Sequence, residues 1–536
     1  MSPAAAKKKV LISDKMSEEA VRILQESGEF DVVYNPEISH EDLIKDIGQY
    51  SALLIRSRTT VDKDVLANAK VLEVIGRAGV GVDNVDVAEA TERGIIVMNT
   101  PDGNTLSTAE HTITMMLSQA RRIAFADRTM KEGKWEKKGI TGVEMFGKTL
   151  GICGLGRIGR EVAVRAKSFG MRIVGYDPYL SKDAAEKLGI ELMATVDEVV
   201  TEADMLTVHT PLTKDTKGMI GAAQIAKAKK GVMIINCARG GIVDEAALVE
   251  GLKSGKVGGA ALDVFETEPL AADHPLRQFP NVTLTPHLAA STTEAQENVA
   301  RDVALQVLDV LRGIVIRNAV NAPSVDAEVL KRIRPYLTMA EQLGKFTSQV
   351  IKGAVTKLEV QFSGAIMNYP QEPITVAALK GFLEPAASQT VNYVNARGRA
   401  KSRGLEVVET KTSDPGDFTS LVTLKASTAE GNTLTVSATL FGNKQVRIVR
   451  FDDVNTEINP VGRIIMIENV DKPGVIGSAA VLIGKHNINI AEMDLERFEE
   501  GGKAMAFFQV DGEVDDKVLE ELRQLPNIVN ASVISC

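Results

Sequence analysis

The chain has 536 residues, 44% of them hydrophobic and 25% charged, which is typical of a globular protein with several domains. Its net charge of −9 argues against general binding to nucleic acids or to anionic membranes. The three cysteines, Cys153, Cys237 and Cys536, lack the spacing of metal ligands and the even number of a disulfide framework. No run reaches the ~20 apolar residues of a membrane span, and no signal-peptide pattern begins the chain. We therefore expect a cytoplasmic protein without metal, nucleic-acid or membrane partners.

Short β-branched runs alternate with helical patterns over the first three hundred or so residues. A first series of strands is predicted at 8–14, 30–35, 51–57, 71–76 and 94–100, with helices at 18–27 and 40–50. A single long helix is predicted over 108–130, capped by Thr108. A second series of strands follows at 149–154, 172–177, 205–210, 232–237, 259–265 and 281–287. This rhythm predicts two βα modules with parallel sheets, closed by a helix over 294–313 that Ser291 or Thr292 caps.

The pattern changes after a linker at 318–326. One or two helices are predicted over 327–353, followed by strands at 356–362, 420–427 and 433–441, which is an α+β order. The tail then follows the order βαββαβ, with strands at 463–469, 488–498, 504–511 and 528–535 and helices at 475–487 and 517–525. That order is ferredoxin-like. The fold class is therefore α/β for the two modules, followed by an α+β domain and a ferredoxin-like domain.

A glycine loop follows the first strand of the second module. Gly154, Gly156 and Gly159 form a G-x-G-x-x-G pattern that opens a helix, and Asp177 ends the next strand. Such glycines permit close approach of the backbone to a pyrophosphate, which the helix N-terminus stabilises. The carboxylate of Asp177 suits the hydroxyls of an adenosine ribose and would repel a 2′-phosphate. The context of strand, loop, helix and acid therefore favours NAD over NADP, although a glycine turn beside an exposed aspartate is the structural alternative.

Charged side chains follow several predicted strands. Arg56, Ser57 and Arg58 follow one strand, and Arg77 precedes the loop Gly79-Val80-Gly81. In a parallel sheet, ligands bind beyond the carboxyl ends of the strands. Arginines together with free backbone amides favour an anion, either a carboxylate or a phosphate.

Three further strand-end residues suit the oxidation of an alcohol. His287 can take the hydroxyl proton, because an imidazole ordinarily titrates near neutral pH. Glu268 can orient that ring and favour the imidazolium, and Arg239 can clamp a carboxylate and polarise a carbonyl. Each has a structural alternative, since a lone histidine is more often structural, Glu268 could cap a turn and Arg239 could pair with Asp244. Their joint occurrence beside a dinucleotide site favours catalysis.

The motifs "GLGRIGREVA", "VHTPL", "NCARGGIVDE", "ALDVFETEP" and "TPHLAAST" resemble those of the D-isomer-specific 2-hydroxyacid dehydrogenases. "GRAGVGVDNVD" and "MNTPDGNTLSTAEH" resemble, more narrowly, the long D-3-phosphoglycerate dehydrogenases, and the resemblance extends over essentially the whole chain. It implies a discontinuous, flavodoxin-like substrate domain at 1–100 and 296–322 and a Rossmann NAD domain at 101–295. It further implies an intervening domain at 323–458 and an ACT regulatory domain at 461–536.

The resemblance also implies roles for individual residues. His287 would be the acid/base, Glu268 its partner and Arg239 the substrate clamp. The cofactor would be NAD, bound by Gly154, Gly156, Arg157, Ile158, Gly159, Asp177, Thr210, Cys237, Ala238, Arg239, Asp263, His287, Ala289 and Ala290. The substrate would lie against Arg56, Ser57, Arg77, Val80, Gly81 and Asn104. Some relatives have a phosphate-binding arginine where this chain has Lys137 and Lys138, so that contact is left open.

The tail resembles a sensor of L-serine. Asp471 ends a predicted strand, Asn487 and Asn489 begin the next, and we expect Asp471 and Asn489 to lie close together in a βαββαβ fold. A carboxylate and an amide suit an amino acid, which the resemblance implies to be serine, bound at an interface between paired domains. The alternative is ordinary turn chemistry. In the middle domain the basic run Arg397, Arg399, Lys401 and Arg403 is either a solvated face or an anion site.

The resemblance thus implies NAD-dependent oxidation of 3-phospho-D-glycerate to 3-phosphohydroxypyruvate, with L-serine as an effector and a homo-oligomer, either a dimer or a tetramer. The nearest alternative enzyme is a glyoxylate or hydroxypyruvate reductase, against which the two C-terminal domains and the extra arginines count. An NAD-sensing corepressor on the same fold is an alternative from another class of protein. Measurable turnover separates the corepressor from the enzymes.

Overall fold

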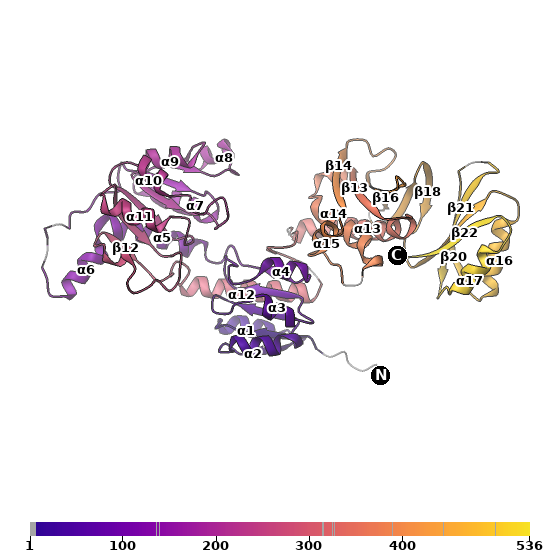
Figure 1. Cartoon of the computed structure of the whole chain (residues 1–536), viewed down its shortest axis with the longest axis horizontal. Coiled ribbons are helices and arrows are strands. Elements are labelled where there is room, and N and C mark those ends of the chain that lie inside the picture. The colour runs from indigo at the N-terminus through magenta and orange to yellow at the C-terminus, as the bar shows by residue number, and fades with distance from the viewer. Residues whose placement is uncertain are drawn as a thin grey trace.

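A computed structural model describes residues 7–135, 137–138, 140–313, 316–323, 325, 327–387, 390–442, 444–498 and 500–536 (Figure 1). Residues 324 and 326 of the predicted linker lie outside this description. The described residues form four sheets, two of them entirely parallel, which confirms the α/β class for the first two modules. None of the described helices is both long and apolar enough to cross a membrane.

The first sheet has the strand order β2-β1-β3-β4-β5. Its strands are β1 (Lys9–Ile12), β2 (Asp31–Tyr34), β3 (Ala52–Ile55), β4 (Val74–Arg77) and β5 (Ile96–Met98), and its helices are α1 (Glu18–Glu26), α2 (His40–Asp46), η1 (Ile47–Gln49), α3 (Lys63–Asn68) and α4 (Val87–Glu92). The much later helix α12 (Thr293–Leu311) packs against α1 and β4, as Figure 1 shows. A methyl group on Gly76 would lie 2.7 Å from both Val303 and Val307, so this contact is close. Thr292 caps α12, as predicted.

The second sheet has the strand order β12-β11-β10-β9-β6-β7-β8. Its strands are β6 (Thr149–Cys153), β7 (Arg172–Tyr176), β8 (Glu191–Leu192), β9 (Met205–Val208), β10 (Val232–Asn236), β11 (Val257–Leu262) and β12 (Val282–Leu284). Its helices are α5 (Thr105–Arg121), α6 (Ile123–Lys131), α7 (Arg157–Ser168), α8 (Lys182–Lys187), α9 (Val196–Glu202), α10 (Ala222–Lys227), α11 (Glu245–Lys253) and η2 (Pro275–Gln278). Because the strands are parallel, their carboxyl ends meet at one edge, where ligands bind.

The prediction of one helix over 108–130 with Thr108 as its cap is wrong. Helix α5 begins at Thr105, and Arg122 separates it from α6 with a left-handed φ of 54°. The guanidinium of Arg122 donates to the carbonyl of Pro280 and lies 5.0 Å from the ring centre of Phe125. The bond to Pro280 depends on a segment 158 residues away, so the local helical pattern does not reveal the break.

The third sheet has the order β14-β13-β15-β16-β17-β18, antiparallel except between β13 and β14. Its strands are β13 (Val355–Gly364), β14 (Glu406–Thr412), β15 (Ser420–Thr428), β16 (Thr433–Phe441), β17 (Gln445–Phe451) and β18 (Val454–Ile458), and its helices are α13 (Ala327–Val350), η3 (Ala365–Asn368), α14 (Glu372–Leu383), η4 (Glu384–Ala386) and α15 (Ala396–Ser402). The sequence pattern does not reveal α14, because this helix is buried on nearly all sides and has no polar stripe.

The fourth sheet has the antiparallel order β20-β21-β19-β22, which confirms the ferredoxin-like tail. Its elements are β19 (Arg463–Val470), α16 (Val475–Lys485), β20 (Asn489–Arg497), β21 (Lys503–Asp511), α17 (Asp516–Arg523) and β22 (Ile528–Ser535). Both helices cover one face of the sheet. The other face shares a core with the third sheet, where the ring of Phe507 lies 6.1 Å from Phe346 and 5.9 Å from Phe451.

Candidate active site

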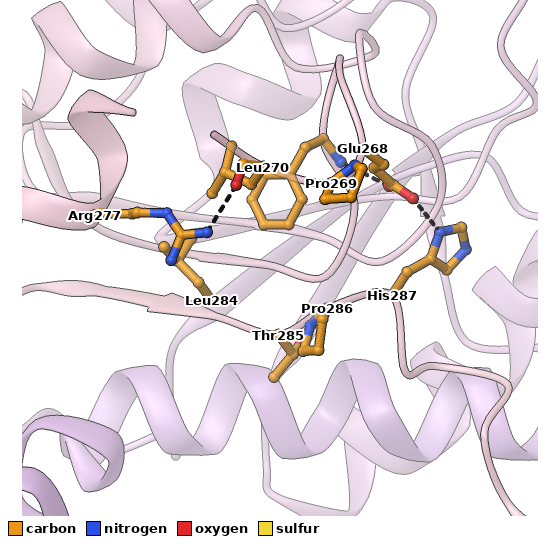
Figure 2. A pocket seen from close by; sticks show the side chains of 9 residues that line it. Glu268, Pro269, Leu270, Arg277, Leu284, Thr285, Pro286 and His287 are labelled. Atoms are coloured by element: carbon orange, nitrogen blue, oxygen red, sulfur yellow. Dashed lines mark hydrogen bonds and ion pairs between the residues drawn. The ribbon is translucent and has the colours of Figure 1, made fainter. Parts of the chain in front are cut away.

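His287 and Glu268 form a pair at the carboxyl edge of the second sheet (Figure 2). The Nδ1 atom of His287 lies 2.8 Å from Oε2 of Glu268, and Oε1 of Glu268 accepts a hydrogen bond of 3.1 Å from the backbone nitrogen of Phe265. A carboxylate only accepts, so Nδ1 carries the proton, and the neutral ring presents an unprotonated Nε2. The geometry therefore suits a base whose orientation a carboxylate fixes.

The backbone at His287 has a left-handed φ of 55°, which is uncommon for a residue other than glycine. Its nitrogen donates to the carbonyl of Asp263 over 2.8 Å. The Asp263 side chain is 0% exposed and accepts from the backbone nitrogens of Leu288 and Ala289 over 2.8 Å each. Asp263 thus holds the turn at 285–289 that carries His287.

A cavity of about 560 Å³ adjoins this pair. Its lining includes Phe265, Glu268, Pro269, Leu270, Arg277, Leu284, Thr285, Pro286 and His287 (Figure 2). Most of these side chains are apolar, and neither Arg77 nor Arg239 is among them. The histidine pair therefore lines a largely apolar cavity that does not include these two arginines.

Arg239 follows β10 and reaches across to the first sheet. Its Nε lies 2.9 Å from Oδ2 of Asp83, in the loop after β4, and not beside Asp244, which instead caps α11. A methyl group on Gly81 would lie 1.7 Å from Nη2 of Arg239, so the guanidinium occupies the space that a side chain would need. The same loop as Arg239 contains Gly240, on which a methyl group would lie 1.8 Å from the carbonyl of Phe265. The loop that contains Arg239 therefore packs closely against the loop that bears Glu268.

Arg77 ends β4 beside the same glycine loop. A methyl group on Gly79 would lie 2.3 Å from its Nη1, and its Nε donates to Oδ1 of Asn84 over 3.1 Å. Burial and the nearby charge of Arg239 lower the pKa of Arg77 to about 10, so the group stays positive at neutral pH. The amide of Asn84 also donates to the carbonyl of Arg56 over 2.7 Å, which ties the ends of β3 and β4 together.

The arginines and the glycine loop thus form one electropositive group, as the sequence indicated. The sequence analysis did not single out Asp83 or Asn84, although both lie within three residues of the glycine loop and that position was the available signal. Of the other predicted substrate residues, Ser57 is exposed, Val80 is partly buried, and Oδ1 of Asn104 is buried without a hydrogen-bond partner among the described residues. Arg58 contacts Asp14 and the carbonyl of Ser13, so it supports the strand ends.

The glycine loop lies between β6 and α7. A methyl group on Gly154 would lie 2.7 Å from the carbonyl of His209, and one on Gly159 would lie 2.1 Å from the carbonyl of Gly154, so both positions need glycine. No atom lies within 4 Å of such a group on Gly156, which leaves room for a ligand. Asp177 accepts from the backbone nitrogen of Leu155 over 2.8 Å. The acid is therefore fixed beside the loop.

The residues around this loop fit a dinucleotide. The Oγ1 atom of Thr210 is buried without a hydrogen-bond partner among the described residues, next to Gly154, and so can bond to a ligand. Arg157 begins α7, and its Nε lies 2.6 Å from Oδ1 of Asp102. Ile158 is partly buried at the same helix end. The loop, an unsatisfied hydroxyl and an anchored carboxylate agree with the donors and acceptors that NAD presents.

Comparisons with known proteins agree with this geometry. Residues 113–289 match the model of the D-isomer-specific 2-hydroxyacid dehydrogenase NAD-binding domain, 332–452 the D-3-phosphoglycerate dehydrogenase intervening domain, and 463–527 the ACT domain. A D-3-phosphoglycerate dehydrogenase of Archaeoglobus fulgidus is 44% identical over 98% of this chain and 99% of its own length. One of Bacillus subtilis is likewise 44% identical, over 98% of this chain and 99% of its own length. The chain belongs to the D-3-phosphoglycerate dehydrogenase family.

Solved structures of other dehydrogenases resemble part of this chain. A glyoxylate reductase of Paecilomyes thermophila has a TM-score of 0.55 at 30% identity, covering 59% of this chain and 98% of its own. A D-lactate dehydrogenase of Escherichia coli has a TM-score of 0.52 at 30% identity, covering 58% of this chain and 99% of its own. The likeness to the dehydrogenases and the NAD-binding domain make the chain an NAD-dependent oxidoreductase, with NAD as its cofactor.

The other residues predicted to contact the cofactor are buried or partly exposed. Cys237 is 4% exposed and Ala289 5% exposed, whereas Ala238 and Ala290 are partly exposed. Burial raises the pKa of the Cys237 thiol to about 12, so it stays protonated. Since Asp263 is fully buried in its turn, its side chain reaches no ligand directly in this conformation.

Replacement of Asp177 is expected to change the choice of cofactor. Asp177→Ala should weaken NAD binding roughly tenfold or more, because a hydrogen bond to a charged group is lost. It should also reduce the preference of the protein for NAD over NADP. Asp177→Asn is the matched control, since its amide oxygen can still accept from the nitrogen of Leu155, although the bond that Oδ1 accepts from Tyr179 is lost. Titration of both cofactors by protein fluorescence measures the effect. If the unmodified protein already binds NADP as well as NAD, the carboxylate does not select the cofactor.

The predicted proximity of Asp471 and Asn489 is wrong within one chain. Strands β19 and β20 both run antiparallel to β21, where Val470 pairs with Lys503 and Asn489 pairs with Asp511. Asp471 therefore lies at one end of the sheet and Asn489 at the other. The sequence order βαββαβ led to the error, because α16 returns the chain along the whole length of the sheet before β20 begins. Asn487 is exposed in the turn before β20, with a φ of 55°.

Each of these two residues has local partners in the chain. Oδ2 of Asp471 lies 2.8 Å from Nε of Arg497 and accepts from the backbone nitrogen of Gly501 over 3.2 Å. The amide nitrogen of Asn489 donates to Oδ2 of Asp511 over 2.7 Å. A ligand that uses both residues must therefore contact two copies of this domain.

The basic run of the middle domain takes part in ion pairs and domain contacts. Arg397 is paired with both Glu372 and Glu409. The guanidinium of Arg399 donates over 3.3 Å to the carbonyl of Glu92, at the end of α4. Arg397 and Arg399 are thus occupied by contacts within the chain, whereas Lys401 and Arg403 are exposed.

Proposed function

We propose that this chain oxidises 3-phospho-D-glycerate to 3-phosphohydroxypyruvate with NAD, the first step of L-serine biosynthesis from 3-phosphoglycerate. The observation that carries the proposal is a base-and-carboxylate pair, His287 with Glu268, joined through one loop to a group of arginines. The positive charges of the arginines suit the binding of both a carboxylate and a phosphate. Relatives of equal length that are named for this reaction support the choice.

In this reaction His287 takes the proton of the substrate hydroxyl at Nε2. Glu268 holds the opposite ring nitrogen, and its charge stabilises the imidazolium that forms. Arg239 binds the α-carboxylate and stabilises the developing carbonyl, while Arg56 and Arg77 bind the phosphate with the amides of the loop at 79–81 and with Ser57 and Asn104. NAD, when bound, accepts the hydride. In the reverse direction the imidazolium returns its proton to the carbonyl oxygen.

The residues that would hold the cofactor lie around the glycine loop. The backbone of Gly154, Gly156 and Gly159, with Arg157 and Ile158, would bind the pyrophosphate at the start of α7. Asp177 would bind the adenosine ribose, and Thr210 contributes a hydroxyl that lacks a partner among the described residues. Cys237, Ala238, Arg239, His287, Ala289 and Ala290 would complete the pocket on the nicotinamide side, and the buried Asp263 would support it from behind without contacting the cofactor.

We propose the domain division that the sequence indicated. The substrate domain comprises 1–100 and 296–322, the NAD domain 101–295, the intervening domain 323–458 and the ACT domain 461–536. The packing of α12 on the first sheet supports the discontinuous substrate domain. The contact between Arg239 and Asp83 joins the first two domains, so it must adjust if Arg239 is to bind the substrate.

A panel of D-2-hydroxyacids tests the proposed function. The purified chain is incubated with NAD and each acid, and NADH formation is followed by absorbance. We expect 3-phosphoglycerate to give the highest kcat/KM of the panel. Preferred reduction of glyoxylate or hydroxypyruvate with NADH would support the alternative enzyme, and binding of NAD without turnover of any acid would support a corepressor.

We further propose that L-serine inhibits the reaction by binding to the ACT domains. Because Asp471 and Asn489 lie at opposite ends of one sheet, serine would lie between two copies of the chain, with Asp471 from one and Asn487 and Asn489 from the other. Such effects couple two sites by roughly 5- to 150-fold in affinity. This site requires a homo-oligomer, a dimer or a tetramer, and we place the enzyme in the cytoplasm.

Mixed oligomers test that arrangement. Asp471→Ala and Asn489→Ala should each abolish serine inhibition and leave uninhibited turnover near normal, because neither residue lies in the dehydrogenase domains. When the two variants are co-expressed, a mixed pair retains one intact site, so partial inhibition should return. The measurement is turnover against serine concentration, with heat of serine binding alongside. Failure of mixing to restore inhibition would refute a shared site of this composition.

A further inference from the structure

Asp263 is a buried carboxylate at the centre of the catalytic turn. Its Oδ1 accepts from the hydroxyl of Thr285 over 2.5 Å and from the nitrogen of Leu288 over 2.8 Å, and its Oδ2 accepts from Ala289. Burial by itself would raise the pKa of Asp263, yet these bonds and one from His111 together hold it below its usual value. The carboxylate therefore remains charged and organises the turn.

His111 contacts this carboxylate from outside the turn. It lies on α5, and its Nε2 is 3.2 Å from Oδ1 of Asp263 and 3.3 Å from Oγ1 of Thr285. The hydroxyl of Thr285 already donates to Asp263, so the Nε2 of His111 must be the donor in this group. Its side chain is 19% exposed, which limits competition from water. Among the described residues outside the turn at 285–289, His111 is the one whose side chain is seen to hydrogen-bond to the carboxylate of Asp263.

The turn needs this support because of its backbone. His287 holds a left-handed φ of 55°, which side chains other than glycine rarely adopt. The ring of His287 meets Glu268 only while the turn keeps that conformation. Asp263 binds the turn from both its carboxylate and its carbonyl, and His111 binds Asp263 from a rigid helix of 17 residues. A change at His111 therefore reaches the base through two hydrogen bonds.

We propose that His111 is a positioning residue that, through Asp263, holds the turn at 285–289 so that His287 is aimed at Glu268 and the substrate. The inference deepens the proposed function and rests on it, since it presupposes that His287 is the base. In this proposal His111 acts only through Asp263, which is itself 0% exposed, and not by contact with the substrate or the cofactor. Its effect is on the orientation of the base and not on the binding of either ligand.

The test compares His111→Phe with His111→Gln. Phenylalanine keeps a ring of similar size but has no donor, whereas the glutamine amide can donate from nearly the same place as Nε2. We expect His111→Phe to lower kcat roughly 10- to 100-fold, since small misplacement of a catalytic group has effects of this size. The KM for 3-phosphoglycerate, the Kd for NADH and the Tm should change little, and His111→Gln should recover most of the loss. Unchanged kcat, or equal losses of kcat, NADH binding and Tm, would overturn the proposal.

A matched control is available elsewhere in the chain. His486 makes a similar pair with Glu521, with Nε2 2.9 Å from Oε2, but in the ACT domain. Assayed without serine, His486→Phe should leave kcat unchanged. A loss comparable to that of His111→Phe would mean that breaking any such pair affects the enzyme.

Hydrogen–deuterium exchange separates this proposal from the proposed function. Peptides covering 285–290 should exchange faster in His111→Phe and at the unmodified rate in His111→Gln, whatever substrate the enzyme uses. If the unmodified protein does not oxidise 3-phosphoglycerate, the proposed function fails while the exchange still tests the positioning. Unchanged exchange in His111→Phe would overturn the positioning role even when turnover of 3-phosphoglycerate is high.

Discussion

His287→Ala is expected to lower kcat for 3-phosphoglycerate by roughly 10²–10⁴-fold, the usual size of general acid–base catalysis. The hydroxyl proton then has no base, because Glu268 contacts Nδ1 of the ring and lies behind it. The affinity for NADH should remain, since the glycine loop and Asp177 belong to other strands. Stopped-flow turnover and NADH fluorescence measure the two quantities.

The left-handed backbone of His287 calls for a second variant. Alanine disfavours that conformation, so part of its effect can come from the turn itself. His287→Asn is the better control, because asparagine tolerates a left-handed backbone and cannot act as a base. A similar loss in both variants assigns the effect to the missing imidazole. Near-normal turnover in His287→Asn would exclude His287 as the base.

Glu268→Gln should have a smaller effect in the same direction. Its amide oxygen can accept from Nδ1 but then no longer from the nitrogen of Phe265, so the ring keeps its hydrogen-bond partner while the charge that favours the imidazolium is gone. A loss in kcat larger than that of His287→Ala would instead suggest that Glu268 itself is the base.

Arg77→Ala is expected to raise the KM for 3-phosphoglycerate about 10- to 100-fold, because a hydrogen bond between charged groups is worth ~1.5–3 kcal/mol. Burial, and after it the like charges of Arg239 and Arg56, lower the pKa of Arg77. An anion between them relieves that repulsion. A phosphate dianion gains more from it than a neutral group, so the KM for an unphosphorylated hydroxyacid should change far less.

Three further variants sharpen this comparison. Arg56→Ala should act in the same direction as Arg77→Ala. Arg77→Lys keeps the charge but loses the planar fork, so an intermediate KM is expected. Arg58→Ala is the matched control, because Arg58 bonds to Asp14 and to the carbonyls of Ser13 and Ile38 and should not discriminate between substrates. Equal changes in KM for phosphorylated and unphosphorylated acids in Arg77→Ala would assign Arg77 a structural role.

The local patterns of the sequence were sufficient for the cofactor loop and for most elements. Gly154, Gly156 and Gly159 lie between a strand and a helix, and Asp177 ends the next strand, because each requirement is met within a few residues of backbone. The ferredoxin-like order of the tail and the cap at Thr292 follow from the same kind of local signal. His287 was expected at a strand end, but its conformation was not.

Only the tertiary structure decided which distant side chains meet. Arg239 pairs with Asp83, 156 residues away, and not with the nearby Asp244, because two separate sheets present these groups to one cleft. Asp471 and Asn489 lie apart because α16 carries the chain back along the sheet, so β19 ends and β20 begins at opposite ends of it. The sequence by itself thus determined the helices and strands, because their signals are periodic and local. It also determined which types of residue make up the site. The pairings within that site depend on strand order, register and close packing, so they emerge only when the whole chain is folded.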